Sequence, residues 1–75
     1  MEAWKKELLK FMDENSLSQV EMTKKINEAG GDINPAGFNH WINRKNSRPN
    51  SVNSVAIEKV LNHKIYFYSE PGEQQ

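Results

Sequence analysis

The chain has 75 residues and a mass of 8.7 kDa, which suffices for one small domain with a single hydrophobic core. Ten basic and ten acidic side chains cancel, so the molecule as a whole carries no net attraction for nucleic acid or an anionic membrane. The absence of cysteine excludes disulfides, thiolate metal sites and cysteine nucleophiles, and no apolar run approaches the roughly 20 residues of a membrane span.

Two amphipathic helices are expected in the first 32 residues. Apolar side chains recur every three or four positions from Trp4 to Met12, which predicts a helix over 3–14 with its lysines on a solvated face. Ser18 and Glu21 have the spacing of a capping box, so a second helix is expected from about residue 19 to 29, before two glycines. The predicted inward face of this second helix comprises Val20 or Met22, Thr23, Ile26 and Ala29.

A third helix is expected to begin at Pro35, because Asn34 can cap a helix and proline is tolerated in the first turn. It should reach about residue 44. Phe38 and Ile42 form the expected apolar stripe, and Trp41 beside them is expected to pack against the core. The opposite face is small and polar, with Ala36, Asn39, His40 and Asn43.

A polar, basic loop over 44–50 separates the third helix from a fourth, expected over 51–61. The expected apolar contacts of the fourth helix are Val52, Val55, Ala56, Val60 and Leu61. Residues 64–68 are rich in strand-forming side chains, which predicts a short strand or an extended tail. The predicted fold is therefore mainly all-α, with four short helices in one domain over residues 1–69 and a flexible tail over 70–75.

Charge is distributed unevenly along the chain. Residues 1–32 carry a net charge of −2, whereas residues 33–69 carry +4. Between Ile33 and Ile57 there is no acidic residue, but there are six asparagines and three cations. Asparagine and arginine can address base edges and phosphates, so a polyanion would bind here. A solvated polar loop is the alternative interpretation of the same composition.

The second and third helices have the outline of a helix-turn-helix. Residues 19–26, with Gln19, Met22, Thr23 and Ile26, and residues 33–43, which read INPAGFNHWIN, resemble the helix-turn-helix of small Cro-type phage repressors. Trp41, Arg48-Pro49 and Ile57-Glu58 extend the resemblance, which covers roughly residues 16–68. One departure is the connection over 27–32, about five residues longer than in that family. Either the second helix gains a turn or the connection loops out.

The resemblance implies sequence-specific binding of operator DNA by a transcriptional repressor that inserts its third helix into the major groove. Base contacts are expected from the third helix, through Asn34, Pro35, Ala36, Asn39, His40 and Asn43. Phosphate contacts are expected from Gln19, Arg44, Lys45, Asn46, Ser47 and Arg48. A second copy of the chain is a further candidate partner, on DNA or in solution, because one helix reads only a few base pairs.

No catalytic residue, metal or cofactor is expected. His40 and His63 lack a carboxylate cluster, and the serines near His40 lack an acidic residue to orient a base. The expected protein is a cytoplasmic, nucleoid-associated DNA-binding protein without membrane or small-molecule partners. The alternative is a small helical module that binds a protein partner, although the polar face of the third helix lacks the apolar anchor such an interface needs.

Overall fold

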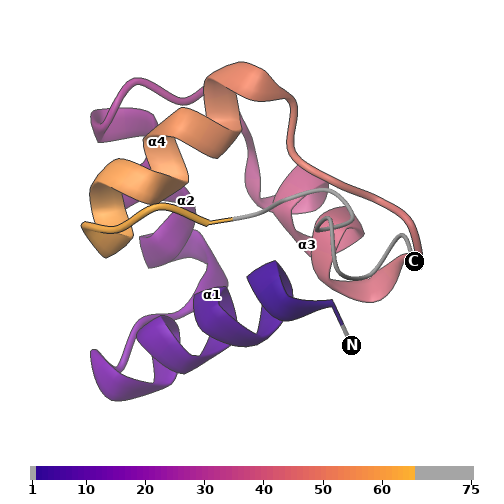
Figure 1. Ribbon diagram of the computed structural model, residues 1–75, viewed down its shortest axis with the longest axis horizontal. Coiled ribbons are helices and arrows are strands. Elements are labelled where there is room, and N and C mark those ends of the chain that lie inside the picture. Colours follow the sequence, from indigo (N-terminus) through magenta and orange to yellow (C-terminus); the bar gives the residue numbers. More distant parts are fainter. Residues whose placement is uncertain (1, 66–75) are drawn as a thin grey trace.

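The computed structural model describes residues 2–65, which form four helices: α1 (Ala3–Glu14), α2 (Gln19–Glu28), α3 (Pro35–Asn43) and α4 (Ser51–Leu61). Helix α2 packs against both α3 and α4, and α1 lies across the same core (Figure 1). The all-α prediction is confirmed, and α1 and α4 have the predicted bounds, while α2 and α3 end one residue earlier. The described residues contain no strand. Most of the strand or tail predicted over 64–68, and all of the tail over 70–75, lies outside them.

Three of the four helices begin at side chains that accept hydrogen bonds from the first turn. The Ser18 hydroxyl accepts from the Glu21 N–H at 3.1 Å, and the Glu21 carboxylate accepts from the Ser18 N–H at 2.8 Å. Asn34 caps α3 by accepting from the Gly37 N–H at 2.7 Å. Asn50 caps α4 in the same way through the N–H of residue 53 at 2.9 Å. These bonds satisfy amides that have no partner inside a helix, so they fix where each helix begins.

All four helices contribute to one hydrophobic core. Its buried members are Trp4, Leu8, Met12, Met22, Ile26, Phe38, Trp41, Ala56, Ile57, Leu61 and Ile65. The inward residue of the first turn of α2 is Met22, because Val20 is 63% exposed. Ile65 continues the core beyond the end of α4, and its N–H donates to the Glu58 carboxylate at 3.0 Å.

The predicted inward face of α4 is partly wrong. Val52 and Val55 are 54% and 50% exposed, and Ile57, omitted from the predicted face, is fully buried. Helix α4 carries apolar side chains on more than one side, so periodicity alone does not identify the buried face. The buried polar side chain of Asn53 faces the connection between α2 and α3, where it accepts from the Asp32 N–H.

Lys5 differs from its prediction, because it is buried rather than on a solvated face, with 6% of its surface exposed. Its ammonium group donates to the Arg44 carbonyl at 2.9 Å and lies 3.7 Å from a Glu2 carboxylate oxygen. Burial of an ammonium is costly unless such partners replace water. The Arg44 carbonyl belongs to the residue that ends α3, where a positive charge also interacts favourably with the helix dipole. Lys5 therefore fastens the first turn of α1 to the end of α3.

The long connection between α2 and α3 loops out instead of extending α2. Gly30 has a φ of 107°, which favours glycine, and Gly31 lies so close to the core that an added Cβ would be 2.6 Å from an Ile26 methyl carbon. The Asn27 amide accepts from the Ile33 N–H at 2.9 Å and donates to the Ile33 carbonyl at 2.7 Å. Asp32, the residue before Ile33, is held in the same way by Asn53. The Asp32 N–H donates to the Asn53 side-chain oxygen at 2.7 Å, and the Asn53 side-chain nitrogen donates to the Asp32 carbonyl at 3.3 Å. Two asparagines thus fix the connection from opposite helices.

Candidate nucleic-acid interface

Helix α3 has a buried face and an exposed polar face. Phe38 and Trp41 are buried, with ring centroids 5.8 Å apart and planes tilted by 56°. The predicted packing of Trp41 is confirmed, but Ile42 is only half-buried, so the apolar stripe is centred on Phe38 and Trp41. The exposed face presents the six side chains predicted to contact bases: Asn34, Pro35, Ala36, Asn39, His40 and Asn43. Helical periodicity places positions 35, 36, 39, 40 and 43 on one side of α3, with Asn34 at its start.

A hydrogen bond joins this surface to the start of α2. The Asn39 amide nitrogen donates to the Gln19 side-chain oxygen at 3.2 Å. This bond uses one N–H of Asn39 and leaves the second N–H and the amide oxygen, a donor and an acceptor of the kind that adenine binds. Because the Gln19 oxygen is the acceptor, the Gln19 amide nitrogen keeps both N–H groups for other acceptors. The predicted base contact and the predicted phosphate contact are therefore neighbours in space.

Two of the predicted base contacts also have structural roles. Asn34 uses its side-chain oxygen to cap α3. Asn43 donates from its amide nitrogen to the Asn39 carbonyl at 3.0 Å, so its side chain lies along the helix. The side chains of His40 and Ala36 are exposed, and they make no hydrogen bond to another part of residues 2–65. Asn39, His40 and Ala36 are thus the side chains that α3 presents most directly.

The start of α2 carries a negative charge that sequence reasoning treated only as a cap. The hydrogen bonds from the Ser18 N–H and hydroxyl hold the pKa of Glu21 below its usual value. Its carboxylate is therefore ionised at neutral pH. It lies beside the N-terminus of α2, a position that otherwise favours a bound phosphate, and so it repels a phosphate there. Glu21 is fully exposed, so solvent screens this repulsion. The capping-box spacing was the sequence signal for this residue.

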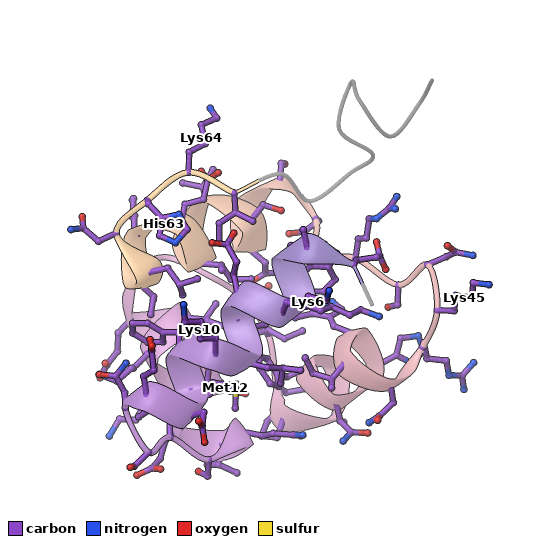
Figure 2. All side chains as sticks on the ribbon, turned by 60° about the horizontal axis from the view of Figure 1, so that its bottom comes forward. Lys6, Lys10, Met12, Lys45, His63 and Lys64 are labelled. Carbon is purple, nitrogen blue, oxygen red and sulfur yellow. The ribbon has the colours of Figure 1, made fainter. Side chains whose placement is uncertain are left out.

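Basic side chains follow directly after α3. Arg44, Lys45 and Asn46 are exposed, and Asn46 has a φ of 66°, which turns the chain at this point. Lys45 projects away from the body of the molecule, on the side opposite His63 and Lys64 (Figure 2). Ser47 is half-buried. The loop therefore offers two exposed cations at the C-terminal end of the polar face of α3.

Arg48, the third cation of this loop, is bonded within the protein. Its Nε donates to a Glu2 carboxylate oxygen at 2.9 Å, and the side chains of Arg48 and Glu2 are 27% and 28% exposed. Partial burial raises the pKa of Glu2, but hydrogen bonds from Arg48 and Trp4 outweigh that effect and leave the pKa below its usual value. Sequence reasoning missed Glu2, since nothing in the local pattern links residues 46 positions apart.

Outside this surface, His63 contacts a single carboxylate of the described residues. His63 lies next to Glu7, with 3.4 Å between Nε2 and the carboxylate oxygen, and both side chains are well exposed. Among residues 2–65, no group of three or more histidine, aspartate or glutamate side chains is placed to hold a metal ion. Within the same range, none of the four helices is long and apolar enough to cross a membrane.

Comparison with models of protein families, with curated proteins and with solved structures found no match to this chain.

Proposed function

We propose that this protein binds double-stranded DNA sequence-specifically and acts as a Cro-like transcriptional repressor. The observation that carries the proposal is the exposed polar face of α3, which is bonded to the start of α2 through Asn39 and Gln19 and is followed by Arg44 and Lys45. In this arrangement α3 enters the major groove, while residues on both sides of it contact the phosphate backbone. Occupation of an operator would then exclude other proteins from that DNA in the cytoplasm.

The chemistry of the exposed face divides the work among its residues. Asn39 presents an amide to adenine, and the Ala36 methyl group can meet the methyl group of thymine. His40 can donate to guanine N7 or to a phosphate. The Gln19 amide nitrogen, Lys45 and Arg44 donate to phosphates, which set the register of α3 but carry no sequence information.

The charge balance predicts modest affinity for one copy of the chain. Its zero net charge gives little long-range attraction, and Glu21 opposes the cations near the proposed interface. Binding of two copies to half-sites about 34–36 Å apart would compensate, because the free energies of the two contacts combine. A palindromic operator is the expected result.

The test is selection from a random-sequence duplex library at two salt concentrations, followed by affinity measurements on the selected site. We expect an enriched motif and an affinity that falls with salt. Asn39→Ala should relax the base preference at one position of each half-site, at a cost of about 1–3 kcal/mol on the preferred sequence. Lys45→Ala should weaken all sequences alike and reduce the salt slope by about one.

Lys10→Ala is the matched control for Lys45→Ala. It removes the same charge from an exposed position on α1, far from Lys45 (Figure 2). Equal effects of the two substitutions would contradict a specific role for the basic loop. No motif and no binding at low salt would reject the DNA-binding function.

A second candidate function is a protein-interaction module, which the exposed apolar side chains favour. Val52 and Val55 lie on the outer side of α4, and Val20 lines an open groove with Ile33 and Pro35. Such side chains can anchor a protein partner. If duplex DNA does not bind at low salt, this function is preferred, and polar substitution of Val52 and Val55 should abolish association with the partner without changing the fold.

A further inference from the structure

Glu2 lies where the start of α1 meets the loop between α3 and α4. One carboxylate oxygen accepts from Arg48 Nε at 2.9 Å, and the other lies 3.7 Å from the Lys5 ammonium. Lys5 is itself fixed by its bond to the Arg44 carbonyl. The carboxylate is thus oriented by two cations, one of which is buried and anchored to the end of α3.

This contact changes the charge that the loop can present. An arginine that binds a DNA phosphate releases condensed counterions, and this release is the main source of salt-dependent affinity. A carboxylate in direct contact with the same guanidinium repels the incoming phosphate while the guanidinium attracts it. For a phosphate well beyond contact distance the two effects largely cancel, because both charges are then nearly equally far from it. At contact, the carboxylate already occupies the Nε donor of the guanidinium. Partial burial of the pair reduces screening by salt.

We propose that Glu2 restrains Arg48 and thereby limits the phosphate binding of the loop after α3. This inference rests on the DNA-binding function proposed above. In the free protein Arg44 and Lys45 are the exposed cations of the loop, and Arg48 becomes a phosphate contact only when the carboxylate is removed or displaced. Glu2 therefore limits how strongly the protein binds the DNA phosphate backbone, without contacting a base.

The test compares Glu2→Gln with the unmodified chain in binding random-sequence duplex DNA between 50 and 200 mM salt. Glu2→Gln should bind more tightly, and the slope of log affinity against log salt should be steeper by about 0.9, the value for one additional phosphate contact. The gain in affinity should therefore be roughly three- to fourfold larger at 50 mM than at 200 mM salt. Glu2→Ala should change the slope by the same amount.

Glu7→Gln is the matched control, because it removes one negative charge five residues further along the chain, at a site 44% exposed and paired with His63. It should leave the slope unchanged. Circular dichroism and the thermal midpoint of each variant establish that it is folded. If Glu2→Gln and Glu7→Gln raise affinity equally with no change in slope, the effect is one of net charge and the inference is overturned.

A double-mutant cycle identifies Arg48 as the group released. Arg48→Ala should have little effect on the affinity of the unmodified chain, but should cancel the gain in the Glu2→Gln background. Equal losses in both backgrounds would mean that Arg48 already contacts phosphate, which overturns the inference while leaving the proposed function intact. If neither the unmodified chain nor Glu2→Gln binds duplex DNA at 50 mM salt, the proposed function fails and the inference fails with it.

Discussion

At the scale of single residues, six asparagines of this protein serve three distinct roles. Two asparagines cap helices, two bind the backbone of the connection between α2 and α3, and two lie on the exposed face of α3. These pairs are Asn34 and Asn50, Asn27 and Asn53, and Asn39 and Asn43. The same short amide suits all three roles, because it donates and accepts from one rigid group. A high asparagine content therefore indicates local backbone bonding as much as base recognition.

The ion pair between Glu2 and Arg48 makes stability depend on pH. Hydrogen bonding lowers the pKa of Glu2 below its ordinary value of 4.5 in the folded chain. The stabilisation is therefore fully present above that value and is lost as the pH falls through the lowered pKa. We expect Arg48→Ala to raise the pKa of Glu2 toward 4.5, as measured by an NMR titration of its carboxyl carbon. An unchanged midpoint in Arg48→Ala would mean that the ion pair does not form in solution.

At the scale of elements, the connection over residues 29–34 orients α3 relative to α2. Asn27 holds it from α2 and Asn53 holds it from α4, each through two hydrogen bonds to one residue's backbone. The two clamps differ in exposure, because Asn53 is buried and Asn27 is exposed. Loss of a buried partner leaves backbone groups without a hydrogen bond, whereas water can replace an exposed one.

We therefore expect Asn53→Ala to lower the free energy of unfolding by about 2 kcal/mol. Asn27→Ala removes the same number of bonds to the connection and is the matched control, with an expected loss below about 1 kcal/mol. Urea denaturation followed by circular dichroism measures both. A loss for Asn27→Ala as large as that for Asn53→Ala would show that burial does not determine the strength of these clamps.

The starts of all four helices and the ends of α1 and α4 could be predicted from the sequence. For α2, α3 and α4 the starts are predictable because capping side chains and proline act over three or four residues. Ser18, Asn34 and Asn50 each stand at a predicted start. The buried face of α4 was less predictable, since its valines and Ile57 occupy more than one side. Only the packing of neighbouring helices determines which side is buried.

The candidate site, like the fold, could be predicted from the sequence only in part. The exposed positions on α3 follow from helical periodicity once Phe38 marks the buried side. The contacts that join distant segments do not follow from local pattern, and three of them shape the site: Asn39 with Gln19, Arg48 with Glu2, and Lys5 with the Arg44 carbonyl. Each depends on how segments far apart in the chain pack together, which spacing along the chain does not encode.

At the scale of the whole molecule, one core supports every element, so α1 is needed for the fold although the candidate site lies on α2, α3 and the loop. Trp4 is 1% exposed and is the largest side chain of α1 in the core. Trp4→Ala should lower the free energy of unfolding by about 3–5 kcal/mol. A chain of this length is typically stable by about 4–11 kcal/mol, so the loss is a large part of the total.

Thermal unfolding followed by circular dichroism checks this expectation, and the midpoint should fall by more than about 12 °C. Lys6→Ala, at an exposed position of the same helix, should change stability by less than about 0.5 kcal/mol. A Trp4→Ala variant with a nearly unchanged midpoint would contradict a single shared core.

The division of α3 into a buried and an exposed face has a consequence for how this protein can evolve. Phe38 and Trp41 hold the helix in place from the inside. Ala36, Asn39 and His40 can therefore be exchanged without disturbing that packing. If α3 reads DNA as proposed, new sequence preferences can arise by a few substitutions on one helix, and a library randomised at these three positions would sample them on an unchanged scaffold.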